Sequence, residues 1–195
     1  MTRPLPSQLR SRGRVEAIFE ATRSLLRDGG IVRCSVAAIS AEAGISPASL
    51  YRYFPDATSI IHALAKESLD EVHRTLEDFL GLLQNQNDVE VVTRKALAYY
   101  LSLFANDRAL QELWRATLAD PQLVALNIED SRRNGLLFAK ALAPYSDLPL
   151  SQLQDRWFLL SHMIGAAVGL MIDVSARQSK RLQKELETLL FQALK

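Results

Sequence analysis

The stretch that decides the fold is SVAAISAEAGISPASLYRYF, residues 35–54. Its first part predicts a short helix over residues 36–42, because the hydroxyl of Ser35 can accept a hydrogen bond from a free backbone N–H of the first helical turn. Gly44 predicts a tight turn directly after this helix, since glycine adopts backbone conformations that other residues avoid. The stretch therefore begins with one short helix followed by a sharp change of direction.

A second short helix follows the turn. Ser46 is a suitable N-cap residue, and Pro47 fits the first helical position, where a missing N–H loses no hydrogen bond. We expect this helix to extend to about Phe54. Two short helices joined by a tight glycine-containing turn form a helix-turn-helix, whose second helix can enter the major groove of DNA.

Helical periodicity continues on both sides of this unit. Upstream, apolar residues spaced by three or four positions run from Val15 to Leu26 and stop at Gly29, which predicts a third short helix. Downstream, the same period predicts six longer helices and no strand, over residues 57–83, 89–105, 109–119, 121–143, 150–176 and 180–194. The predicted fold class is therefore all-α, with a three-helix N-terminal domain and a six-helix C-terminal domain.

The composition places the chain among soluble globular proteins. Its 195 residues include 23 basic and 22 acidic residues, and 48% are hydrophobic, which excludes wholesale disorder. The single cysteine excludes an intrachain disulfide and a cysteine-based zinc site, and it suits a reducing compartment. The longest nearly apolar stretch, residues 157–172, is shorter than the about 20 residues that a membrane span needs. We therefore expect a cytoplasmic protein without a membrane segment.

Charge is distributed unevenly along the chain. Residues 1–54 carry eight arginines and four acidic residues, whereas the net charge of the whole chain is only +1. A basic end of this kind indicates binding to a polyanion such as nucleic acid, although a solvated surface can produce the same excess. We predict one domain over residues 1–56, which opens on a disordered arginine-rich tail at about residues 1–11, and a second domain over residues 57–195.

The second short helix would present a face suited to DNA. We expect Ile45 and Leu50 to pack beneath it, against Ile39 of the first short helix. Arginine can bind guanine or phosphate, and serine and tyrosine hydroxyls reach phosphate oxygens. The residues left on the outer face are Ser46, Pro47, Ala48, Ser49, Tyr51, Arg52 and Tyr53.

Four short motifs in the first 64 residues form a recognisable set. They are Ile18-x-x-Ala21 with Leu25-Leu26 and Gly29, Ser35-Val36-x-x-Ile39, Ala43-Gly44-Ile45-Ser46, and Leu50-Tyr51-Arg52-Tyr53-Phe54. With these motifs, residues 14–64 resemble the DNA-binding domain of the TetR family of bacterial transcriptional regulators. The remaining chain resembles that family in length and helical layout only.

The resemblance implies which residues contact DNA. The family typically has a lysine where this chain has Ala57, so the phosphate contact of that lysine is missing here. It commonly has alanine at the position of Ser40, a small change that packing should tolerate. Arginines of the N-terminal tail could replace the lost contact or lie free in solvent. The family's base- and phosphate-contacting positions fall on Ser35, Ser46, Pro47, Ala48, Ser49, Tyr51 and Tyr53, with Arg52 between the two tyrosines.

A single recognition helix makes few contacts, so we expect a homodimer that reads the two halves of a palindromic operator in double-stranded DNA. The resemblance implies that the last two helices of each chain form a four-helix bundle with those of the partner. Small residues in one of these helices permit close approach, although they would serve packing within the chain as well. The predicted interface residues are Gly165, Ala166, Gly169, Leu182, Leu186 and Leu189.

The resemblance also implies a pocket for a small-molecule effector among the middle helices. Aromatic side chains can line such a pocket, but at helical spacing they more often form ordinary core. A histidine on an apolar helix face can likewise line a pocket or belong to the ordinary core. The predicted lining residues are Phe79, Tyr100, Phe104, Trp114, Phe138, Trp157 and His162.

Enzyme motifs are missing from the sequence. It contains no phosphate-binding glycine loop, no GxSxG and no HExxH, and its three histidines lack metal-ligand spacing. We therefore predict a protein that is not an enzyme and has no cofactor or metal: a dimeric, ligand-responsive repressor, released from its operator by a small apolar or amphipathic effector. Two alternatives remain, a regulator without an effector and an all-α enzyme or small-molecule carrier that uses the same apolar interior.

Overall fold

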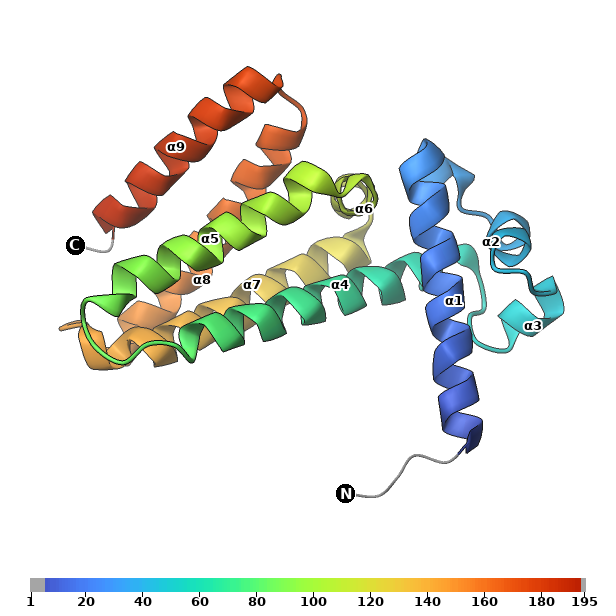
Figure 1. Ribbon diagram of the computed structural model, residues 1–195, viewed down its shortest axis with the longest axis horizontal. Coiled ribbons are helices and arrows are strands. Elements are labelled where there is room, and N and C mark those ends of the chain that lie inside the picture. Colours follow the sequence, from blue (N-terminus) through green and yellow to red (C-terminus); the bar gives the residue numbers. More distant parts are fainter. Residues whose placement is uncertain (1–5, 194–195) are drawn as a thin grey trace.

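The computed structural model describes residues 6–193, with side chains over residues 11–192. Within that range the chain forms nine α-helices and two short 3₁₀ turns and no strand, so the all-α prediction is confirmed (Figure 1). The 3₁₀ turns, Ile31–Arg33 and Ala143–Tyr145, follow α1 and α7. The helices are α1 Pro6–Gly29, α2 Val36–Glu42, α3 Pro47–Tyr51, α4 Ala57–Leu80, α5 Asp88–Asn106, α6 Arg108–Thr117, α7 Pro121–Leu142, α8 Leu150–Ile172 and α9 Ala176–Ala193.

The first helix begins earlier than the sequence predicts. α1 starts at Pro6, well before Val15, so residues 6–11 are helical where a disordered tail is expected. Apolar periodicity begins only at Val15, because residues 11–14 are exposed. Proline at the first turn and intrinsic helix propensity favour the helix before that point. Arg3 and the rest of residues 1–5 lie outside the described residues.

Two hydrophobic cores divide the molecule, and α4 contributes to both. Its first half places Ile60 and Leu64 in a core with residues of α1, α2 and α3. Its second half places Val72 and Leu76 in a core with residues of α5, α7, α8 and α9. The first core also includes residues of α6 and Leu123 of α7. The predicted boundary before residue 57 therefore falls at the start of a helix that is shared by the two cores.

The C-terminal helices approach one another closely where α7 crosses α8. Gly135 of α7 makes this possible, because a Cβ atom at that position would lie 2.5 Å from the backbone nitrogen of Phe158. α9 packs against α5 and α8 at the edge of the bundle, far from α2 and α3 (Figure 1). Across residues 6–193, every helix falls short of the length and apolar character needed to span a membrane.

Candidate nucleic-acid interface and interior pocket

The helix-turn-helix has the geometry that the sequence predicts. Ser35 caps α2 by accepting a hydrogen bond from the backbone N–H of Ala38 at 3.1 Å. Gly44 adopts a φ of 63° in the turn, a left-handed conformation that glycine reaches without strain. Ile39 of α2 and Leu50 of α3 are fully buried in the first core. The inner faces of both helices are thus fixed, and the outer face of α3 is free.

Most residues expected to contact DNA lie on the surface of α3. Tyr51 is 55% exposed, and the side chain of Arg52 is exposed and has no hydrogen bond or ion pair with any described residue. α3 ends at Tyr51, three residues before the expected end at Phe54. Tyr53 is half-buried against the first core, so only part of its side chain is available to DNA. The remaining members of this face are Ser46, Pro47 and Ala48, which are exposed, and Ser49, which is half-buried.

Two serine hydroxyls at this interface are held in place by helix capping. Ser46 accepts a hydrogen bond from the backbone N–H of Ser49 at 3.2 Å, as Ser35 does at the start of α2. In each cap the hydroxyl oxygen is the acceptor, so its hydrogen remains free to donate to a phosphate oxygen. The caps therefore orient two donors before any DNA is bound.

The arginines of the N-terminal region differ in their availability. Arg23 forms ion pairs with the carboxylates of Glu16, Glu20 and Glu67, which neutralise it within the protein. Four further arginines are exposed and form no ion pair with the described residues, so they leave positive charge at the surface. These are Arg12, Arg14, Arg27 and Arg33.

The two predicted interface glycines of α8 pack against a side chain of the same molecule. Gly165 and Gly169 both face Trp114 of α6, and a Cβ atom at Gly169 would overlap the indole nitrogen. Their small size is therefore explained by packing within the chain. Ala166, the third predicted position on α8, is exposed.

α8, one of the two helices expected at the dimer interface, also presents an apolar face to solvent. Leu159, Met163 and Leu170 are 60%, 53% and 55% exposed, and with Ala166 they follow the spacing of one helix face. That spacing was the signal available in the sequence. The predicted interface leucines of α9 differ in burial: Leu189 is 62% exposed, and Leu182 and Leu186 are half-buried.

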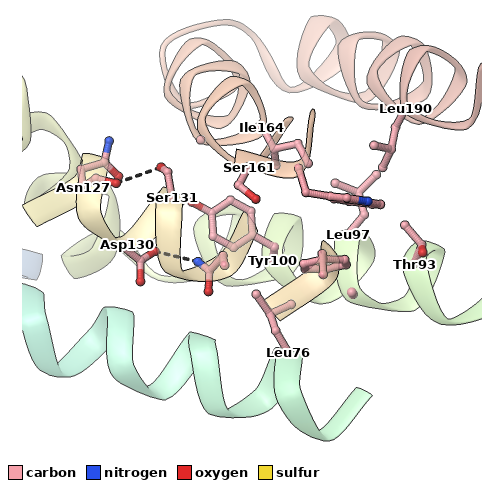
Figure 2. Close-up of a pocket in the computed structure, with 15 residues that line it drawn as sticks. Leu76, Thr93, Leu97, Tyr100, Asn127, Asp130, Ser131, Ser161, Ile164 and Leu190 are labelled. Carbon is pink, nitrogen blue, oxygen red and sulfur yellow. Dashed lines mark hydrogen bonds between the residues drawn. The ribbon is translucent and has the colours of Figure 1, made fainter. Parts of the chain in front are cut away.

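An interior pocket lies between α4, α5, α7, α8 and α9 (Figure 2). The cavity itself measures about 60 Å³, and the space counted out into the solvent at its mouth is about 590 Å³. Three of the predicted lining residues, Tyr100, Phe138 and Trp157, line it. The rings of Phe138 and Trp157 stack with their centroids 4.5 Å apart and form a flat apolar wall. Further apolar contacts come from Leu76, Leu97, Ile164 and Leu190.

Four predicted lining residues do not line this pocket. Phe79 packs edge-on against the ring of Tyr99. Phe104 and Trp114 contact each other, with ring centroids 6.0 Å apart. His162 is exposed and borders a separate groove between α6, α7 and α8, together with Trp114. Helical periodicity assigns each residue to a face of its own helix, but it does not show which faces surround a cavity.

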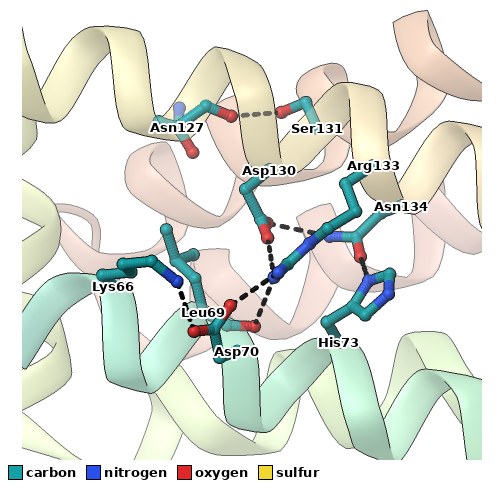
Figure 3. A network of polar contacts seen from close by, with 9 residues as sticks. All are labelled: Lys66, Leu69, Asp70, His73, Asn127, Asp130, Ser131, Arg133 and Asn134. Atoms are coloured by element: carbon teal, nitrogen blue, oxygen red, sulfur yellow. Dashed lines mark hydrogen bonds and ion pairs between the residues drawn. The ribbon is translucent and has the colours of Figure 1, made fainter.

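One side of the pocket is polar, and the sequence analysis missed it. Asn127, Asp130, Ser131 and Asn134 all line the pocket and lie at i, i+3, i+4 and i+7 along α7. This spacing of polar residues was the signal in the sequence, since it places them together on one helix face. Asp130 accepts hydrogen bonds from Arg133 at 2.9 Å and from Asn134 at 2.8 Å (Figure 3).

The polar stripe continues into a network between α7 and α4. Arg133 also donates to Asp70 at 2.5 Å, and Asp70 accepts from Lys66 at 2.6 Å. Burial raises the pKa of Asp130, and Arg133 opposes that shift only in part. Burial also acts on Asp70, but its bonds to Lys66 and Arg133 prevail and lower its pKa. In the described part of the chain, no group of His, Cys, Asp and Glu side chains could hold a metal ion.

Comparisons with known proteins cover both parts of the fold. Residues 18–64 match the family model described as bacterial regulatory proteins, tetR family. Residues 87–195 match the model of the tetracyclin repressor-like C-terminal domain. Among curated proteins, the nucleoid occlusion factor SlmA of Pasteurella multocida is 38% identical over 64 residues, which are 33% of this chain and 32% of that protein. The match therefore spans about a third of the relative's length.

Solved structures show the same fold over nearly the whole chain. A TetR-family transcriptional regulator from Streptomyces coelicolor superposes with a TM-score of 0.71 at 19% identity, covering 93% of this chain and 97% of that one. The fatty acid degradation regulator FadR from Bacillus halodurans superposes with a TM-score of 0.69 at 14% identity, covering 97% and 96%. Because the two family models together match both the DNA-binding region and the C-terminal helices, the chain belongs to the TetR family of bacterial transcriptional regulators.

Proposed function

We propose that this protein is a dimeric repressor that binds a palindromic operator through α3 and leaves it when a small molecule occupies the interior pocket. The observation that carries the DNA-binding part is the contrast between the two sides of α3. Leu50 is fully buried, whereas Tyr51 and Arg52 are exposed, with the Arg52 side chain unpaired among the described residues. A helix anchored by its inner face, with free donors on its outer face, suits the major groove. Its place of action would be the cytoplasm.

Specific binding would require two copies of the chain. α3 is five residues long, so one copy can read only a few base pairs. In a dimer the two recognition helices would occupy half-sites about 34–36 Å apart, one turn of DNA. The exposed apolar face of α8 and Leu189 of α9 support a helical dimer interface at the end of the molecule away from α3.

α4 would transmit the response from the pocket to the recognition helix. Its Leu76 lines the pocket, and its Ile60 and Leu64 lie in the core that supports α3. Arg23 of α1 binds Glu67 of α4 at 2.5 Å, so a tilt of α4 would displace α1 as well. A ligand shifts such an equilibrium only by the difference between its affinities for the two forms, typically about 1–3 kcal/mol.

The experiment that tests this proposal begins with duplexes selected from a random DNA library by the full-length protein. Fluorescence anisotropy then measures the affinity for the selected operator. We expect both Arg52→Ala and Tyr51→Phe to weaken operator binding, because each removes a hydrogen-bond donor to a base or a phosphate. For Arg52→Ala we expect a loss of affinity of about tenfold. Helical content by circular dichroism should stay unchanged, because both side chains are exposed.

Arg74→Ala is the matched control for charge, because Arg74 is an exposed arginine of α4 that lies outside α3 and outside the predicted dimer helices. This control should bind the operator as tightly as the parent protein. Unchanged affinity in both α3 variants, or an equal loss in Arg74→Ala, would contradict the assignment of α3 as the recognition helix. For the repressor role, transcription in vitro from a promoter overlapping the operator should fall when the protein is added.

A further inference from the structure

The residues that line the pocket include one acidic side chain and no basic one. Of the fifteen residues that line it, Asp130 is the only one with a carboxyl group, and there is no lysine, arginine or histidine among them. The Asp130 side chain is only 11% exposed. A ligand in this pocket therefore meets one buried carboxylate and no cation.

Asp130 shares its one arginine partner with a second carboxylate. Arg133 is its ion-pair partner, but the same guanidinium also binds Asp70 (Figure 3). One arginine thus serves two carboxylates, and Lys66 assists Asp70 without contacting Asp130. Consistent with this geometry, the pKa of Asp130 is raised by burial in spite of the neighbouring arginine. Lys66, Arg133, Asp70 and Asp130 together sum to zero charge, so an ammonium ligand would be attracted by the Asp130 carboxylate at the pocket wall and not by a net charge of the network.

Two hydroxyl groups of the lining have no hydrogen-bond partner among the described residues. The Thr93 side chain is 2% exposed, and its hydroxyl oxygen has no hydrogen bond among the described residues. The hydroxyl of Tyr100 likewise has no bond within the described chain, and burial together with the charge of Asp130 raises its pKa. Figure 2 shows Tyr100 and Ser161 on the side of the pocket that holds the polar stripe. Buried hydroxyls without partners favour a ligand that supplies them.

The opposite side of the pocket accepts a flat apolar group. Phe138 and Trp157 lie with their ring planes 16° apart, and Leu97 and Leu190 also line this region. Aromatic rings of a ligand gain both buried apolar area and ring stacking against such a wall. The pocket is therefore amphipathic, with an acidic end and an aromatic end.

We propose that the effector class of this pocket is a cationic amphiphile, with an ammonium group near Asp130 and an aromatic or alicyclic body against Phe138 and Trp157. This inference rests on the proposed function, in that it specifies the ligand of the same pocket. An anionic ligand such as a carboxylate would bring a second negative charge into a buried site, where like charges repel strongly. An alcohol would be accepted, but without the charge-assisted hydrogen bond.

Three probes that share a naphthalene body and differ in their head group test this inference. They are 2-(1-naphthyl)ethylamine, 2-(1-naphthyl)ethanol and the carboxylate of 1-naphthylacetic acid. Isothermal titration calorimetry at neutral pH measures the Kd of each for the full chain. We expect the amine to bind at least about tenfold more tightly than the alcohol, since a hydrogen bond to a charged group contributes more than a neutral one. The carboxylate should bind most weakly.

Asp130→Asn identifies the carboxylate responsible. This variant keeps the side-chain shape and should bind the amine and the alcohol with nearly equal Kd. Glu129→Gln removes the same charge from an adjacent exposed position on α7, and it should retain the preference for the amine. The wild-type ranking requires no variant, so it tests the proposal even if Asp130→Asn fails to fold.

The possible outcomes separate this inference from the proposed function. Equal binding of the amine and the alcohol, or tighter binding of the carboxylate, would overturn the cationic class and leave a ligand-binding pocket in place. A preference that survives in Asp130→Asn would overturn the role of Asp130. If no probe binds, both the cationic class and the ligand response fail for this pocket, while operator binding is tested separately through α3.

Discussion

Ser40 is a polar residue buried in α2. It is 1% exposed, and its hydroxyl oxygen has no hydrogen-bond partner among the described residues. A buried hydroxyl without a partner is unfavourable by roughly 1–3 kcal/mol. We predict that Ser40→Ala raises the free energy of unfolding by about 1 kcal/mol, measured by urea titration. Operator affinity should stay unchanged, because Ser40 does not reach the surface.

The same substitution at Ser131 provides the control. Its hydroxyl donates to the carbonyl oxygen of Asn127 at 2.8 Å and lies 3.1 Å from Nδ1 of His162. Ser131→Ala removes these bonds and should lower the free energy of unfolding. A Ser40→Ala protein that is less stable than the parent would contradict the prediction and show that the hydroxyl has a partner.

For single residues, the sequence predicts those that act on neighbours close to them along the chain. Ser35, Gly44 and Ser46 cap or turn the chain within three residues of their own position, so local chemistry was enough to assign them. Asp130 was missed because its role depends on burial by other helices and on an arginine shared with Asp70 of α4. The polar spacing along α7 places Asp130 on a shared helix face, but it does not show which other helices bury that face.

Among the helices, the crossing of α7 and α8 depends on a single glycine. A Cβ atom at Gly135 would lie 2.5 Å from the backbone nitrogen of Phe158 and 2.6 Å from its Cα atom. Backbone atoms cannot rotate away as a side chain can, so Gly135→Ala must push the two helices apart. We predict a fall in the free energy of unfolding of about 2 kcal/mol, despite the higher helix propensity of alanine. Scanning calorimetry measures it as a lower Tm.

Gly13→Ala separates packing from propensity. Gly13 lies in α1, and a Cβ atom there would meet nothing within 4 Å. This variant should gain about 0.5–1 kcal/mol, because glycine loses more backbone freedom than alanine when a helix forms. Stability changes of the same sign at the two positions would contradict this account of the crossing.

The helices themselves could be predicted because each one is encoded within its own segment. Periodicity and capping placed nine helices, and Pro121 and Leu150 are the observed first residues of α7 and α8. The contacts between helices could not be predicted in the same way. Gly165 and Gly169 were assigned to a dimer interface on their size, yet the group that requires them to be small is Trp114 of another helix.

Considered as a whole, the molecule has α3 at one end and α8 and α9 at the other (Figure 1). Leu159, Met163 and Leu170 of α8 are all more than half exposed, as is Leu189 of α9. Exposed apolar side chains along one helix face mark an interaction site. Two-fold pairing through this face would bury it and set the distance between the two copies of α3.

We therefore predict that the protein sediments as a dimer and that Leu159→Lys combined with Met163→Lys releases monomers. Two buried lysines facing each other across a two-fold axis would be both desolvated and mutually repelled, so dissociation should follow without loss of the monomer fold. Sedimentation velocity measures the oligomeric state, and operator affinity should fall by at least about tenfold because a monomer binds only one half-site.

Leu82→Lys is the control, since Leu82 is also about half exposed but lies in the turn after α4, and this variant should remain dimeric. A monomeric parent protein, or a double variant that stays dimeric, would exclude this face of α8 as the interface and leave the spacing of the recognition helices to another pair of surfaces.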